Sequence, residues 1–147
     1  MTYHAILGFR RTMSTKQRSD VDVVRDVYEA VGRGDVERAV AAFDEDIEWI
    51  EPEGGPFGGT YHGADEVVEN VFARLGDEWD EFVVEPDRFV AEDGSVVALV
   101  THRGTRAGTG ETFEAPVADV WALEDGTITR FQHYVGSVRY VERRGNP

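Results

Sequence analysis

Hydrophobic residues recur at helical spacing in the first half of the chain and alternate with polar residues in the second half. Between residues 20 and 75, three stretches repeat apolar side chains every three or four positions, which predicts three helices. A short strand is expected between the second and third helices, and from Glu81 onward the alternation predicts four antiparallel strands. This order is typical of an α+β domain with its helices on one face of a curved sheet.

Cap residues set the expected boundaries of the helices. Ser19 and Asp22 resemble a capping box, which predicts that the first helix begins at about residue 20. Asp35 is expected to cap the second helix, and the third helix is expected over residues 64–75. The apolar residues expected on the inner faces of the three helices are Val21, Val24, Tyr28, Val31, Val36, Ala39, Val40, Phe43, Val67, Val68, Val71, Phe72 and Leu75.

Turn signals separate the four strands of the second half. Asp93-Gly94 and Asp125-Gly126 predict hairpin turns, and a glycine-containing turn is expected over residues 108–110. Pro86 predicts a bulge or an edge within the first of these strands. The segment from Ser137 onward shows no strand alternation and is expected to be helical at most.

Length and composition are typical of a soluble single-domain protein. We expect an N-terminal arm over residues 1–19 and one domain over residues 20–147. The absence of cysteine excludes disulfides and thiolate chemistry, and no apolar run approaches the ~20 residues that a membrane helix needs. No signal-peptide pattern opens the chain, so we expect a cytoplasmic protein with no membrane partner.

The net charge is strongly negative. Fifteen basic and 29 acidic residues give a formal charge of −14, and Lys16 is the single lysine. This sign argues against nucleic acid as a partner, because phosphate binding requires basic residues. We interpret the acidic surface as a halophile-type adaptation that keeps the protein soluble at high salt, where the repulsion is screened.

Glu51 ends the short strand that precedes the third helix. Ile47, Trp49 and Glu51 occupy alternate positions and are therefore expected on one face of this strand. A carboxylate on a buried face is costly unless it is partnered or its pKa shifts. Its position alone leaves two interpretations open, a buried functional carboxylate or a rim carboxylate that points to water.

Asp119 and His133 also lie on apolar strand faces. Asp119 alternates with Val117 and Trp121, so it must be paired, neutral or functional, and a structural hydrogen bond is the alternative. His133 shares a face with Phe131 and could act as an acid, a base or an orienting group for a carboxylate. A buried structural histidine explains the same pattern.

Other polar positions carry weaker signals. Tyr28 lies among the valines of the first helix, where a core tyrosine needs no function. His102 is interpreted as outward-facing or structural. No tight ligand spacing such as H-x-x-x-H occurs, and the glycine-rich residues 54–59 lack the Lys-Ser/Thr of a phosphate-binding loop. We therefore expect no metal and no cofactor, and we interpret the glycine-rich segment as a flexible lip or lid over a cavity mouth.

Several short motifs occur in a specific order along the chain. They are Val27–Asp35, Phe43–Asp46, Tyr61–Gly63, Glu124–Ile128 and Phe131–Tyr134. This ordered set resembles the NTF2-like superfamily, specifically its SnoaL-like and ketosteroid-isomerase-like branches, over about residues 20–140. The resemblance implies a cone in which a strongly curved, mostly antiparallel sheet and three helices enclose one apolar cavity, and it implies a homodimer.

The resemblance also implies a set of site residues. The positions of a tyrosine on the first helix, a carboxylate before proline and an acid after Ala-Pro match Tyr28, Glu51 and Asp119. Glu51 would move a proton next to a carbonyl, Tyr28 and a neutral Asp119 would hold the enolate, and His133 would relay protons. Two departures are Glu51, where the isomerases carry aspartate, and Gly136, where many SnoaL-like chains carry aspartate. The expected cavity wall consists of Trp49, Trp121, Phe131, Val117 and Val135.

Three functions are compatible with these residues. The leading hypothesis is a cofactor-free protein that binds a small apolar carbonyl compound and performs isomerase-type or cyclase-type proton transfer. A non-catalytic binding module could use the same cavity. An enzyme resembling an epoxide hydrolase would need an arginine between two acids, and Arg130 is the candidate for that role.

Overall fold

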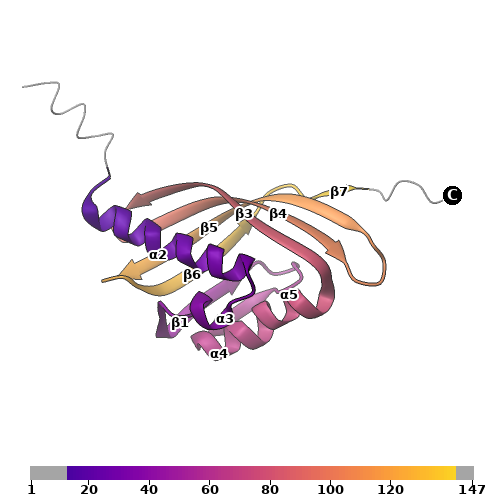
Figure 1. Cartoon of the computed structure of the whole chain (residues 1–147), viewed down its shortest axis with the longest axis horizontal. Coiled ribbons are helices and arrows are strands. Elements are labelled where there is room, and N and C mark those ends of the chain that lie inside the picture. Colours follow the sequence, from indigo (N-terminus) through magenta and orange to yellow (C-terminus); the bar gives the residue numbers. More distant parts are fainter. Residues whose placement is uncertain (1–12, 142–147) are drawn as a thin grey trace, which may run out of the picture.

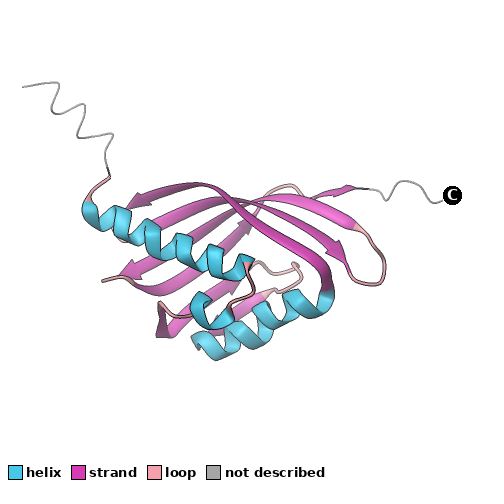
Figure 2. Ribbon diagram, in the orientation of Figure 1, coloured by secondary structure: helices cyan, strands magenta, loops and turns pink. Residues whose placement is uncertain are grey.

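The structure is a computed structural model that describes residues 13–141, and these residues form a curved sheet with helices gathered on one side of it (Figures 1 and 2). The expected α+β cone is confirmed. The elements, in chain order, are α2 (Thr15–Gly32), α3 (Val36–Ala39), β1 (Phe43–Glu51), β2 (Gly59–His62), α4 (Gly63–Val67), the π-helical segment η1 (Val68–Phe72), α5 (Ala73–Glu78), β3 (Trp79–Glu92), β4 (Ser95–Arg106), β5 (Thr112–Glu124), β6 (Thr127–Val135) and β7 (Arg139–Val141).

The sheet contains seven strands in the order β2-β1-β6-β5-β4-β3, with β7 paired to β5. All pairs are antiparallel except β1 with β6, which run parallel. The parallel pair brings Trp49 beside Phe131, and the β5–β6 hairpin makes Asp119 and His133 direct cross-strand partners. Strands that lie far apart in sequence thereby place their polar residues on one part of the sheet.

The first helix begins five residues before the expected start. Ser14 is the N-cap of α2, and its side chain and Gln17 form the reciprocal capping box that the sequence analysis assigned to Ser19 and Asp22. Residues 15–19 of the expected arm are therefore helical, whereas residues 1–12 lie outside the described part. The expected cap of α3 is confirmed, since the Asp35 carboxylate accepts a hydrogen bond from the Arg38 backbone N–H.

Two short strands and one helix irregularity were not expected. β2 pairs with β1 inside the segment interpreted as a turn, and the tail after Ser137 forms β7 and not a helix. Both strands have four residues or fewer and β2 has no fully buried side chain, so neither gives the long alternating pattern that marks a buried strand. The third helix continues past Leu75 to Glu78 and contains η1, which widens one turn.

The hydrophobic core lies between the helices and the concave side of the sheet. Ile47, Trp49 and Glu51 are all buried, which confirms the alternation expected for β1. Burial of each large apolar side chain typically stabilises the fold by about 1.5–3 kcal/mol. Within the described residues, no helix is both long and apolar enough to cross a membrane. The buried hydrophobic residues of the core cluster are Val21, Val24, Val27, Tyr28, Ile47, Trp49, Phe57, Val67, Val71, Val96, Ala98, Val100, Val117, Trp121, Leu123, Ile128 and Phe131.

Candidate functional site

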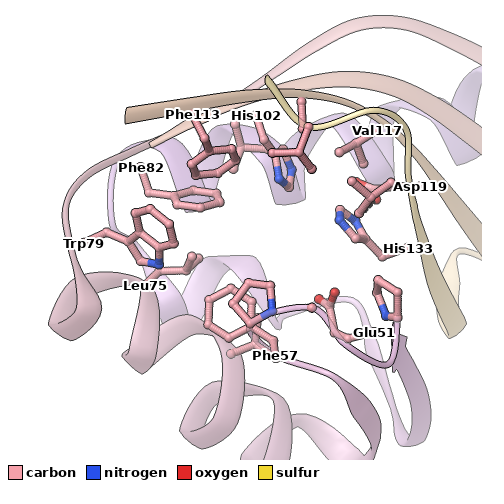
Figure 3. A pocket seen from close by; sticks show the side chains of 18 of the residues that line it. Glu51, Phe57, Leu75, Trp79, Phe82, His102, Phe113, Val117, Asp119 and His133 are labelled. Atoms are coloured by element: carbon pink, nitrogen blue, oxygen red, sulfur yellow. Dashed lines mark hydrogen bonds and ion pairs between the residues drawn. The ribbon is translucent and has the colours of Figure 1, made fainter. Parts of the chain in front are cut away.

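A cavity of about 700 Å³ opens between the sheet and the helices. Figure 3 shows its polar groups Glu51, Asp119 and His133 on one side and the aromatic residues Trp79 and Phe82 on the opposite side. The expected wall residues line this cavity, although Val135 is 42% exposed and therefore lies toward the mouth. These wall residues are Trp49, Trp121, Phe131, Val117 and Val135.

Asp119 is the centre of a buried hydrogen-bond chain. Its side chain is on β5 and is only 2% exposed. The Tyr28 hydroxyl donates to Asp119 Oδ2 at 2.5 Å, and the Trp121 indole N–H donates to the Tyr28 oxygen at 3.0 Å. On the other side, Asp119 Oδ1 lies 2.6 Å from His133 Nδ1. Both oxygens of the carboxylate therefore have a partner, and the chain fixes its orientation.

This arrangement favours the protonated form of His133. Burial, the largest influence, lowers the pKa of His133, but the hydrogen bond and negative charge of Asp119 and the charge of Glu51 together raise it above the usual value. The ring nitrogen that does not contact Asp119 remains available, and His133 lines the cavity. His133 can therefore deliver a proton to a bound molecule.

Glu51 is a buried carboxylate, so the interpretation as a rim carboxylate that points to water does not hold. It is 8% exposed, and the Trp49 indole N–H donates to its Oε1 at 3.0 Å. Burial is the main cause that raises the pKa of Glu51, and the positive charge of His133 and the Trp49 hydrogen bond partly offset it. A carboxylate with a raised pKa is better suited to accept a proton reversibly near neutral pH.

Tyr28 and Asp119 bind each other, which differs from the arrangement implied by the resemblance. Two donors that hold one enolate oxygen would need to point together at a ligand. Here the Tyr28 hydroxyl is already engaged by Asp119 and Trp121. Burial, followed by the charge and hydrogen bond of Asp119, raises the pKa of Tyr28 well above its usual value, so the phenol stays protonated. Both residues thus position His133.

His102 lines the cavity, which contradicts its interpretation as outward-facing and leaves the structural interpretation open. Its ring stacks on the His133 ring with centroids 5.1 Å apart, and it lines the same cavity. Burial is the main cause that lowers the pKa of His102 to about 4, so this imidazole is neutral near pH 7. Sequence reasoning missed it because the direction of its side chain depends on the β4–β5 register, in which His102 pairs with Ala115.

The ligand atoms of His102, Asp119 and His133 all lie within 4.8 Å of one another, so these three side chains could in principle bind a cation. The spacing of the three residues along the chain gave no such signal, since each comes from a different strand. The distance of 2.6 Å between Asp119 Oδ1 and His133 Nδ1 is that of a hydrogen bond. We therefore interpret the group as a hydrogen-bonded acid–base cluster.

Arg130 does not form the site of an epoxide hydrolase. Its guanidinium is paired with the Glu48 carboxylate at 3.1 Å, and the two side chains are 45% and 41% exposed. It also donates to the Gln132 side chain at 2.8 Å. Glu48 belongs to the face of β1 opposite Glu51, so the arginine points away from the acids of the cavity.

The glycine-rich segment after β1 carries one buried residue, Phe57, which lines the cavity. The Tyr61 hydroxyl donates to the Phe57 carbonyl at 2.6 Å, and Arg74 donates to the Pro56 carbonyl at 2.9 Å. The Arg74 guanidinium also lies over the Phe57 ring, 4.9 Å from its centroid, and pairs with Glu78. These contacts attach the expected lip to α5, which the sequence pattern could not show.

The fold and the cavity define the class of protein. The SnoaL-like domain family matches residues 24–131, so the chain belongs to this family. An uncharacterised protein of Mycobacterium tuberculosis is 30% identical over 121 residues, which cover 79% of this chain and 88% of that protein.

Solved structures show the same architecture. An NTF2-like protein of Burkholderia thailandensis is 38% identical and superposes with a TM-score of 0.76, covering 80% of this chain and 90% of that chain. TerC, which was co-crystallised with polyporic acid, is 22% identical with a TM-score of 0.73, covering 80% of this chain and 92% of that chain. At the latter identity the likeness shows the fold alone.

Proposed function

We propose that this protein is an acid–base enzyme that moves a proton on the carbon next to a carbonyl group of a small, mostly apolar ring compound. One observation carries the proposal: the buried Tyr28–Asp119–His133 chain ends on an aromatic-walled cavity that also contains the buried carboxylate of Glu51. Sites with perturbed acids and bases in an apolar pocket are typical of proton-transfer enzymes.

The two titratable groups have complementary roles. Ionised Glu51 accepts the proton from carbon, and the His133 imidazolium donates a proton to the carbonyl oxygen, which forms an enol. Neutral His133 then takes back the oxygen proton while Glu51 returns its proton to a carbon atom, so both groups regain their first state. Each such general acid or base typically contributes about 10²–10⁴-fold to the rate.

Asp119 supports this cycle without taking a proton. Its negative charge stabilises the imidazolium, and its two hydrogen-bonded oxygens keep the ring of His133 in one orientation. Tyr28 and Trp121 act through Asp119, and Trp49 holds Glu51 in the same way. Buried dipoles placed in advance cost no reorganisation during the reaction.

The aromatic wall favours a flat, ring-containing ligand. Trp49 stacks on Phe131 with centroids 3.7 Å apart, and Phe82 and Phe113 face the other side of the cavity. Such surfaces contribute large apolar contact areas and bind π-systems. The co-crystallisation of TerC with polyporic acid supports this choice at the level of the fold.

Exchange of carbon-bound hydrogen tests the proposal directly. The protein is incubated with 2-tetralone in D₂O, and loss of the proton signal next to the carbonyl is followed by NMR. We expect exchange above the buffer rate, lowered at least about 100-fold by Glu51→Gln and by His133→Ala. His62→Ala, which alters an exposed histidine outside the cavity, is the matched control. Equal exchange in all variants would exclude acid–base catalysis, and tight binding without exchange would favour the binding module.

A further inference from the structure

The three tryptophans of the chain all lie within the described residues, and they differ in one respect. The indole N–H of Trp49 donates to Glu51, and that of Trp121 donates to Tyr28. The Trp79 nitrogen is also buried, but it has no hydrogen-bond partner among residues 13–141. Buried polar groups in folded proteins are nearly always hydrogen-bonded, so an exception calls for a partner.

Trp79 lies at the side of the cavity opposite Asp119 and His133 (Figure 3). Its ring is enclosed by aromatic neighbours, with the Phe82 centroid at 5.3 Å and the Phe113 centroid at 5.1 Å. The Arg106 guanidinium covers it at 5.2 Å. A Cβ atom at Gly104 would collide with the Phe113 ring and lie 3.0 Å from the Trp79 ring. The absence of a side chain at Gly104 therefore leaves room for the Trp79 indole and the Phe113 ring.

We propose that the Trp79 indole N–H is a specificity-determining donor that binds an acceptor oxygen at the far end of the ligand. This inference rests on the proposed function, since it concerns the ligand of the same cavity. It adds that the ligand is polar at both ends: one oxygen meets His133 and Glu51, an aromatic or apolar body fills the middle, and a second oxygen meets Trp79. Trp79 lines the cavity that this ligand would occupy.

An unpaired buried donor gives strong discrimination between ligands of equal shape. A ligand with an acceptor oxygen at this place pairs the N–H, whereas an isostere with a methylene group leaves it unpaired. The energy of one such hydrogen bond corresponds to about a fivefold to tenfold difference in affinity. Two probes realise this comparison: 6-acetyl-2-naphthol and 6-isopropenyl-2-naphthol, which differ by C=O against C=CH₂.

The experiment combines affinity with the NMR signals of the indole groups. Protein labelled with ¹⁵N-tryptophan should show three indole signals, and Trp79→Phe identifies one of them. We expect 6-acetyl-2-naphthol to move the Trp79 signal downfield and to bind about fivefold to tenfold tighter than the isopropenyl probe. Trp79→Phe should remove this preference, whereas Phe82→Leu, which alters the same aromatic wall without a donor, should retain it.

The outcomes separate this inference from the proposed function. Equal affinity of the two probes, with an unmoved Trp79 signal while the protein is saturated, overturns the role of Trp79 and leaves acid–base catalysis at Glu51 and His133 untouched. Failure of both naphthols and of unsubstituted 2-naphthol to bind removes the aromatic ligand that both proposals share. Exchange of 2-tetralone protons, measured separately, then decides whether catalysis survives.

Discussion

Removal of the Tyr28 hydroxyl is the most direct test of the hydrogen-bond chain behind His133. Tyr28→Phe deletes two contacts at once, the donation to Asp119 at 2.5 Å and the acceptance from Trp121 at 3.0 Å. The ring itself stays in place, because its packing against Phe89 and Trp121, at centroid distances of 6.0 and 5.6 Å, does not involve the hydroxyl. The variant therefore isolates polar energy from packing energy.

The expected cost follows from what is left behind. A buried indole N–H without an acceptor costs about 1–3 kcal/mol, and a lost hydrogen bond to a charged group costs about 1.5–3 kcal/mol. Together they predict a loss of about 2.5–6 kcal/mol in the free energy of unfolding, a large share of the about 5–15 kcal/mol typical of a domain. A domain of this size loses roughly 3 °C in melting temperature per kcal/mol, so the midpoint should fall by about 8–18 °C.

Urea unfolding followed by tryptophan fluorescence measures this loss. In the double variant Tyr28→Phe/Trp121→Phe, the indole N–H that Tyr28→Phe alone leaves unpaired is absent. The double variant should therefore lose less unfolding free energy than the sum of the losses in the two single variants. Coupling between contacting residues of this kind is typically about 0.5–3 kcal/mol. A cost below about 1 kcal/mol for Tyr28→Phe, or a coupling energy of zero, would refute the hydrogen-bond chain as a stabilising unit.

Three further predictions concern charge and access. The pKa of His133 should exceed the ordinary 6.5 in an NMR titration and fall in Asp119→Asn; the stability that this pair adds is complete below pH 6.5 and is lost as pH rises through the folded-state pKa. The net charge of −14 should raise the melting temperature between about 0.1 M and 1 M salt, as the Debye length shrinks from about 10 to 3 Å, and a flat or falling midpoint would contradict the halophile interpretation. Arg74→Gln removes the hydrogen bond to the Pro56 carbonyl and the cation–π contact with Phe57, so it should speed both binding and release of 2-naphthol in stopped-flow fluorescence. The exposed control Arg88→Gln should leave both rates unchanged. Unchanged rates in Arg74→Gln as well would argue against a lid.

Strand periodicity predicted the face of β1 correctly, because alternation is a local property of the backbone. The pattern placed Glu51 and Asp119 on the same faces as Trp49 and Trp121, and the structure shows that both carboxylates are buried. The direction of His102 does not follow in this way, since it depends on the pairing of β4 with β5 and on the stacking of two rings from separate strands. Local sequence therefore gave the two acids as candidates, and the pairing of strands was needed to place them and His102 in one cavity.

The unpaired nitrogen of Trp79 could not be predicted from the sequence for a related reason. Every tryptophan carries an indole N–H donor, whatever its sequence context. Whether that donor has an acceptor is known only when all of its neighbours in the fold are known. The same holds for the clamp on Phe57, because Arg74 lies 18 residues from the Pro56 carbonyl that it binds. Proteins that share a fold and a core pattern differ in such side-chain contacts between separate elements, and these contacts shape the functional site.

Glu51 provides the last prediction, because its charge opposes folding while it supports the proposed chemistry. Burial raises the pKa of Glu51 above the usual 4.5, so the folded state disfavours its ionised form. A group with a raised folded-state pKa withdraws stability as pH rises from its unfolded value through the folded one, and the loss is constant above that window. Glu51→Gln keeps the acceptor for Trp49 and removes the charge. We expect this variant to match the parent at low pH and to exceed its unfolding free energy at pH 7 and above, while carbon–hydrogen exchange is lost. Glu45→Gln, at an exposed position of β1 outside the cavity, should show neither change. A stability difference independent of pH would show that Glu51 is not a buried, ionising carboxylate, and the proposed base would have to be sought elsewhere in the cavity.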